Sequence, residues 1–186
     1  MESNFTEEIE SLRNKLSGTD HAPHHPDATV AAVLVPIVMR EQGPSLIFTR
    51  RTDDLPNHRS EICFPGGKAD RDENGKAAAL REAEEELGIT PDDVELLGRL
   101  PAVFTIVSGF SIEPWVGIVK SIDLTPNPRE IADVFEVTFD HLRSVRRDQK
   151  FIRDGQMYIN PAYDAGDNII WGATARILSH LLELLG

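Results

Sequence analysis

An almost unbroken apolar run, TVAAVLVPIVM at residues 29–39, constrains the fold of this chain more than any other feature. The run falls well short of the roughly 18 apolar residues that a membrane-spanning helix needs. A continuous apolar run of this length is typical of a strand that is buried on both faces. Both faces of the sheet must then be covered, so the run predicts an α/β or α+β sandwich.

Shorter segments extend this sheet and supply its covering helices. The helical spacing of apolar residues predicts helices at 1–17, 76–87 and 173–185, with Gly88 ending the middle one, and the turn at 140–145 also looks helical. Turn residues and short apolar runs predict strands at 45–49, 62–64, 94–100, 102–107, 112–120, 133–139, 156–162 and 168–171. We therefore expect an N-terminal helix and linker over residues 1–27, followed by one domain over residues 28–186.

The charge balance and the cysteine content exclude several classes of protein. Among 186 residues, 31 are Asp or Glu and 19 are Lys or Arg, which gives a net charge of −12. This balance disfavours duplex nucleic acid as a partner, because such binding relies on clustered Lys and Arg. The single cysteine, Cys63, excludes an internal disulfide framework and a cysteine-based zinc site. Without a secretory h-region or a membrane span, we expect a cytoplasmic protein with no membrane partner.

A dense group of glutamates marks the middle helix as the chemically informative segment. On a helical wheel, the apolar stripe consists of Leu80, Ala83 and Leu87, and the acidic side chains that cluster broadly opposite it are Glu82, Glu85 and Glu86. Like charges four residues apart cost an isolated helix about 0.2–0.5 kcal/mol. A divalent cation bound between the glutamates would turn this repulsion into a net attraction. An all-oxygen ligand set suits Mg²⁺ or Mn²⁺. A solvated acidic face is the alternative interpretation of the same pattern.

Residues 67–89, GKADRDENGKAAALREAEEELGI, resemble the Nudix box, GX5EX7REUXEEXGU, where U is an aliphatic residue. Every defined position of the box agrees. The resemblance implies a Nudix-type α/β/α sandwich with a mixed sheet, and a single Nudix hydrolase domain at 28–186. It also implies an enzyme that hydrolyses the pyrophosphate bond of a nucleoside diphosphate linked to another moiety.

The resemblance also implies roles for individual residues. Metal ligands would be the carbonyl of Gly66 and the carboxylates of Glu82, Glu85 and Glu86. Arg81 would orient these carboxylates, and Glu73 would brace the loop before the helix. The base that takes the proton of the attacking water would be Glu82 or Glu85, with Glu130 as the alternative.

The segment before the box resembles the coenzyme A pyrophosphatase branch of the family. The agreeing positions are Thr49, Arg51, Thr52, Leu55, His58, Glu61 and 64–68, whereas Pro56 stands where Arg is usual and Ser60 where Gly is usual. This branch cleaves coenzyme A or acyl-coenzyme A to 3′,5′-ADP and (acyl-)4′-phosphopantetheine. The resemblance therefore implies substrate contacts at Arg50, Arg51, His58 and Arg59.

Two other functions stay open at this point. One is a Nudix hydrolase of ADP-ribose or another nucleotide sugar, and the other is a nucleotide-binding sensor without turnover. Sensors with this fold usually lack box carboxylates, which are present here. A homodimer is expected from the family alone. We expect Trp171 and Gly172, before the last helix, to serve the packing that closes the fold.

Overall fold

The computed structural model describes residues 2–17, 27–53, 61–106, 108–120, 123–153 and 155–186. Its helices are α1 (Glu2–Ser17), α2 (Gly75–Leu87), α3 (Phe139–Ser144) and α4 (Gly172–Leu185), with a 3₁₀ turn η1 (Pro91–Asp93). Its strands are β1 (Thr29–Arg40), β2 (Gly43–Arg51), β3 (Ile62–Cys63), β4 (Gly66–Lys68), β5 (Val94–Arg99), β6 (Val103–Phe104), β7 (Phe110–Val119), β8 (Ile131–Thr138), β9 (Arg146–Arg153), β10 (Gln156–Ala165) and β11 (Asn168–Ile170).

The apolar run forms β1, the central strand of a mixed sheet. Within the described residues, the sheet has eight strands, and its main path runs β3-β2-β1-β7-β5. β1 is parallel to β7 and antiparallel to β2 and to β4. β8 adds to β2, and β6 adds to β7. The prediction of an α/β sandwich around a mixed sheet is confirmed.

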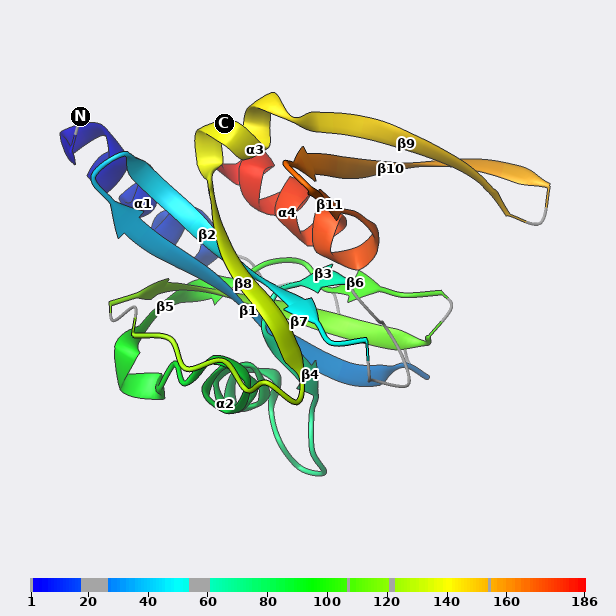
Figure 1. The fold of residues 1–186 in the computed structure, drawn as a ribbon, viewed down its shortest axis with the longest axis horizontal. Coiled ribbons are helices and arrows are strands. Elements are labelled where there is room, and N and C mark those ends of the chain that lie inside the picture. The colour runs from blue at the N-terminus through cyan, green and yellow to red at the C-terminus, as the bar shows by residue number, and fades with distance from the viewer. Residues whose placement is uncertain (1, 18–26, 54–60, 107, 121–122, 154) are drawn as a thin grey trace.

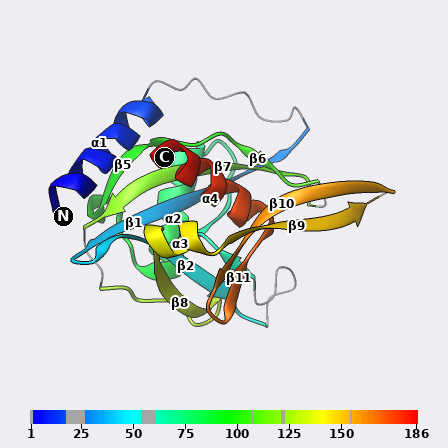
Figure 2. The same ribbon diagram turned by 90° about the horizontal axis from the view of Figure 1, so that it is seen from above.

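The two faces of the sheet are covered by different helices, as Figures 1 and 2 show. Side chains alternate along β1, so Leu34 and Val38 pack with Ala83 and Leu87 of α2. Val35 and Ile37 belong to the larger core on the other face, which includes buried residues of α1 and α4. Burial of β1 on both faces is therefore what holds the three layers together.

Local sequence signals set both ends of α2. The Asn74 side chain accepts a hydrogen bond of 2.9 Å from the backbone N–H of Ala77 and so caps the first turn. At the other end Gly88 adopts a left-handed conformation with φ 73°, and its N–H donates to the carbonyl of Glu84. This is the C-cap that the sequence predicts.

α1 is packed into the same core as the sheet. Ile9, Leu12 and Leu16 are buried, and Leu12 is fully enclosed. Ion pairs along the helix add contacts, with Arg13 on Glu95 and Arg143 on Glu8, each at 2.6 Å. The boundary between residues 27 and 28 stays a prediction.

Two strands were not predicted, and one of them builds a separate arm. β4 has only three residues, Gly-Gly-Lys, and owes its strand character to pairing with β1. β9 reads RRDQKFIR, pairs with β10, and extends with it well beyond the rest of the fold (Figure 1). Because β9 is exposed along its described length, its sequence lacks the apolar pattern by which strands are predicted.

No helix in the described part of the chain is both long and apolar enough to cross a membrane.

Replacing Leu12 with Ala tests the packing of α1. The side chain is 0% exposed, so its truncation should lower the free energy of unfolding by about 2–5 kcal/mol, measured by urea denaturation. Glu7→Ala, at an exposed position of the same helix, should change it by less than about 0.5 kcal/mol. Equal effects of the two substitutions would contradict the packing.

Candidate active site

The box glutamates of α2 lie in three different environments. Glu86 is 1% exposed and faces the sheet, Glu82 is half-buried, and Glu85 is exposed. The helical wheel was therefore wrong in placing all three opposite the apolar stripe. The interface of α2 with the sheet is made of small side chains, Ala78, Ala79 and Ala83, so the helix approaches closely and Glu86 falls within the interface.

Glu86 is held by two partners that the sheet supplies. Its carboxylate accepts a hydrogen bond of 3.1 Å from the backbone N–H of Gly66, and one of 3.2 Å from the guanidinium of Arg51. Burial raises the pKa of Glu86 to about 7, although both partners oppose this shift. The site thus contains a carboxylate that costs energy to ionise and that would be stabilised by added positive charge.

Glu82 lies directly against Gly67. A Cβ atom at Gly67 would come within 2.5 Å of the Glu82 carboxylate, so a larger residue here would displace the Glu82 side chain. Gly66, at φ 155°, would bring a Cβ atom into the backbone of Ala32 and Val33. The glycine pair therefore lets β4 lie against β1 on one side and against the glutamates of α2 on the other.

Arg81 ties the glutamates to the loop before the helix. Its guanidinium donates two hydrogen bonds of 3.1 Å to Glu73, one of 2.9 Å to Glu82 and one of 3.2 Å to Glu85. Glu73 in turn accepts from the backbone N–H of Asp70 at 2.9 Å, and Arg81 holds the pKa of Glu73 below its usual range. Arg81 therefore links Glu82 and Glu85 to Glu73, and Glu73 is tied to the loop through Asp70.

The loop before β8 brings Glu130 toward the carboxylates of Glu82 and Glu86. The backbone N–H of Asn127 donates to the carbonyl of Glu86 at 2.9 Å, and that of Thr52 donates to the carbonyl of Glu130 at 2.9 Å. Burial raises the pKa of Glu82, and the charges of Glu85 and Glu130 raise it further. Glu130 also raises the pKa of Glu86. The fold thus gathers acidic groups from α2 and from this loop.

The arginines that the sequence predicts as substrate contacts are separated by the fold. Arg51 lies at the carboxylates, paired with Glu86. Arg50 lies on an exposed surface, where it donates to Asp133 at 2.8 Å. His58 and Arg59, together with Pro56 and Ser60, lie outside the described residues. The role of Arg51 toward Glu86 was missed, since an arginine in a strand gives no sign of which helix residue it will meet.

The donor set fits a hard divalent cation. Among the described residues, no three His, Cys, Asp or Glu side chains already surround a common point. However, the burial of Glu82 and Glu86 disfavours their ionised forms, and a cation near both would offset this cost. The available donors are carboxylate oxygens and backbone carbonyls, the kind that Mg²⁺ and Mn²⁺ prefer.

Comparison with known proteins gives the same family as the box. The Nudix domain model matches residues 28–157. A protein of Yersinia pestis named as an uncharacterized Nudix hydrolase, NudL, is 39% identical over 160 residues, which cover 82% of this chain and 78% of that protein.

Solved structures agree in fold. Ap4A hydrolase from C. elegans has a TM-score of 0.53 at 21% identity, over 60% of this chain and 81% of that one. A MutT/nudix family protein from Enterococcus faecalis has a TM-score of 0.58 at 13% identity, over 97% of this chain and 79% of that one. With the complete box, the domain match and the NudL-like relative, this chain belongs to the Nudix family of pyrophosphohydrolases.

Proposed function

We propose that the substrate is coenzyme A or an acyl-coenzyme A, cleaved to 3′,5′-ADP and (acyl-)4′-phosphopantetheine. The observation that carries the reaction is the pair of desolvated carboxylates, Glu82 and Glu86, against the Gly66-Gly67 segment. The choice of substrate is supported by the segment around β2 and β3, whose motif resembles that of coenzyme A pyrophosphatases.

Pyrophosphate hydrolysis requires neutralised phosphate charge and an aligned water molecule. A bound Mg²⁺ or Mn²⁺ would supply positive charge and lower the pKa of water. In this proposal Glu82, Glu85, Glu86 and the carbonyl of Gly66 hold the metal. Nudix hydrolases generally use divalent metals, and a cation beside Glu86 would offset the desolvation of its ionised carboxylate.

Within this chain, the proton of the attacking water would pass to Glu82 or Glu85. Glu82 is favoured because burial raises its pKa above the usual value, which suits a general base working near neutral pH. Arg81 holds its carboxylate in place through the hydrogen bond of 2.9 Å. Glu130, whose charge acts on Glu82, is the alternative base.

A homodimer formed through the β9–β10 arm is also part of the proposal. Five large apolar side chains on the arm are 36–78% exposed: Phe151, Ile152, Met157, Tyr158 and Ile159. The register of the arm places Ile152, Met157 and Ile159 on one face and Phe151 and Tyr158 on the other. At about 200 Å² for a large side chain, the first face presents roughly 400 Å² of apolar surface. A standard interface buries about 800 Å² per partner, of which just over half is apolar, so this face of the arm comes close to what a second copy requires.

Glu86→Gln should abolish turnover and should stabilise the metal-free protein at high pH. With a folded-state pKa of about 7 against an ordinary 4.5, Glu86 binds its proton more tightly in the folded state. Wild-type stability should therefore fall as pH rises from about 4.5 to 7, by about 3 kcal/mol at most. Urea denaturation with chelator should show Glu86→Gln more stable by about 1–3 kcal/mol at pH 8, and equal to wild type at pH 4.

The exposed Glu84→Gln is the matched control and should behave as wild type in both respects. Added Mg²⁺ or Mn²⁺ should stabilise wild type and Glu84→Gln, but not Glu86→Gln. Full turnover in Glu86→Gln, or equal stability of all three proteins at pH 8, would contradict the assignment of Glu86.

Hydrolysis of coenzyme A, dephospho-coenzyme A and ADP-ribose, measured in parallel, tests the substrate. We expect metal-dependent release of 3′,5′-ADP, with coenzyme A preferred and no activity in chelator. A preference for ADP-ribose would indicate a nucleotide-sugar hydrolase. Absence of turnover on all three would favour a sensor.

Substitutions of the neighbouring Arg50 and Arg51 test separate roles in turnover and in substrate binding. Arg51→Ala should lower kcat for coenzyme A and ADP-ribose alike, by tenfold or more, because Arg51 contacts Glu86. Arg50→Ala should raise the KM for coenzyme A and leave kcat nearly unchanged. Similar kinetic effects from both substitutions would remove this division of roles.

Light scattering during gel filtration tests the arm. Wild type should elute with the mass of a dimer, and a double variant Ile152→Glu/Met157→Glu should elute as a monomer. Gln149→Glu, which adds charge at an exposed position on the other face of the arm, should remain dimeric. A monomeric wild type, or a dimeric double variant, would overturn the proposed interface.

A further inference from the structure

Trp171 is a large aromatic side chain that the fold leaves half in solvent. It follows β11 and is the N-cap residue of α4, yet its side chain makes no capping hydrogen bond. The residue is 51% exposed, whereas the neighbouring Ile170 is fully buried. The expectation that Trp171 serves the packing that closes the fold is therefore wrong for the exposed half of its side chain. That exposed aromatic surface is accessible to a ligand.

The backbone around Trp171 joins it to the strand next to the carboxylate site. One helical turn on, the hydroxyl of Thr174 donates to the carbonyl of Ile62 in β3 at 3.1 Å. β3 pairs with β2, and the backbone N–H of Arg51 donates to the carbonyl of Glu61 at 3.1 Å. Since Arg51 contacts Glu86, Trp171 lies at the same end of β2 and β3 as the reacting groups.

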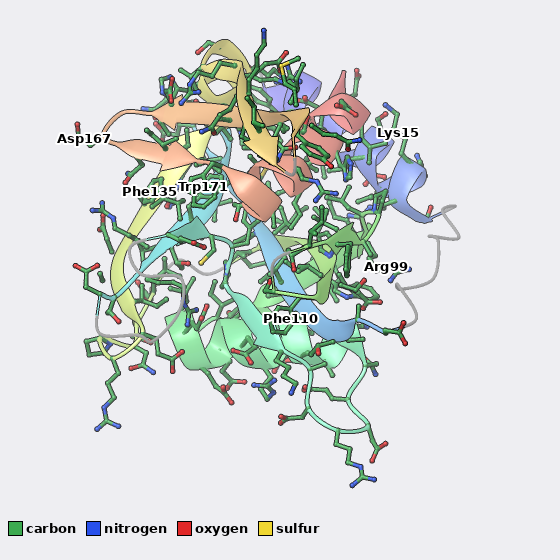
Figure 3. All side chains as sticks on the ribbon, turned by 90° about the vertical axis from the view of Figure 1, so that its right-hand side faces the viewer. Lys15, Arg99, Phe110, Phe135, Asp167 and Trp171 are labelled. Atoms are coloured by element: carbon green, nitrogen blue, oxygen red, sulfur yellow. The ribbon has the colours of Figure 1, made fainter. Side chains whose placement is uncertain are left out.

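The face of β2 and β8 that is turned away from α2 is aromatic at Phe48 and Phe135 and polar at Arg50 and Asp133. Figure 3 draws Trp171 and Phe135 between the β9–β11 sheet and α2. Phe135 stacks on Phe48 with ring centroids 5.7 Å apart, and two positions along these strands Arg50 pairs with Asp133. Side chains two residues apart share a strand face, so Arg50 and Asp133 lie on the face that carries the two phenylalanines.

We infer that the exposed indole of Trp171 is the surface on which the purine base of the substrate stacks. A flat aromatic face binds any base by its π surface, and a nearby arginine can meet the phosphate or ribose of the same nucleotide. Trp171 lies on the face of the sheet opposite to α2. β3 pairs with β2 beside Arg50 and Arg51, so a nucleotide would reach from the carboxylates past this end of β2 to the indole. The inference rests on the proposed function and adds the base-binding residue to it.

Tryptophan fluorescence tests the contact without turnover. The chain has two tryptophans, Trp115 and Trp171, so Trp115→Phe leaves Trp171 as the sole reporter. Adding 3′,5′-ADP, AMP or ADP-ribose should quench its emission saturably, whereas 4′-phosphopantetheine, which has no purine, should not. Unchanged emission with all three nucleotides, or equal quenching by 4′-phosphopantetheine, overturns the inference.

Steady-state kinetics provide the second test. Trp171→Ala should raise the KM for coenzyme A roughly five- to hundredfold, the range for loss of one stacked base, with kcat within about twofold. Trp171→Phe should recover most of the affinity because it keeps an aromatic face. Ile169→Ala, at a position 50% exposed on β11, is the matched control and should behave as wild type.

The two proposals can fail separately. If coenzyme A is hydrolysed normally by Trp171→Ala, with an unchanged KM, then the stacking residue is wrong and the proposed function stands. If no substrate is turned over but adenine nucleotides quench Trp171, then the purine site stands and the proposed function fails.

Discussion

The burial of the Glu86 carboxylate is the interaction on which the rest of the site depends. An ionised carboxylate is costly in a helix–sheet interface unless it is paired, and here it has one backbone N–H and one guanidinium. Both partners come from the sheet, so α2 has to lie at a defined height and rotation above it. The position of Glu82 and the orientation imposed by Arg81 follow from that single placement.

The glycine pair and the alanine face of α2 make this placement possible. Gly66 and Gly67 allow backbone to approach both β1 and the Glu82 carboxylate, where any Cβ atom would overlap them. Ala78, Ala79 and Ala83 let the helix approach the sheet closely, and Leu87 near its end packs against Leu34 and Val38. Small residues thus bring the charged side chains of the site close together. A bound cation would offset the electrostatic cost of gathering these buried carboxylates.

Much of the fold could be predicted because burial leaves a periodic trace in the sequence. The unbroken run of β1 and the capped, amphipathic α2 were both predicted close to their observed bounds. β4 was missed because three residues, two of them glycine, carry no periodicity. β9 was missed because the arm contacts solvent on both faces, so no alternation distinguishes it from a charged loop.

By itself, the sequence determined the reaction class through its resemblance to the Nudix box, and local helix geometry determined that the box glutamates share one helix. It also determined that α2 ends at Gly88. Only the tertiary structure decided that Glu86 is buried, that Arg51 faces it, and that Trp171 is exposed beside β3. These facts concern residues far apart in the chain, and their contacts arise from packing between elements, which no local pattern encodes.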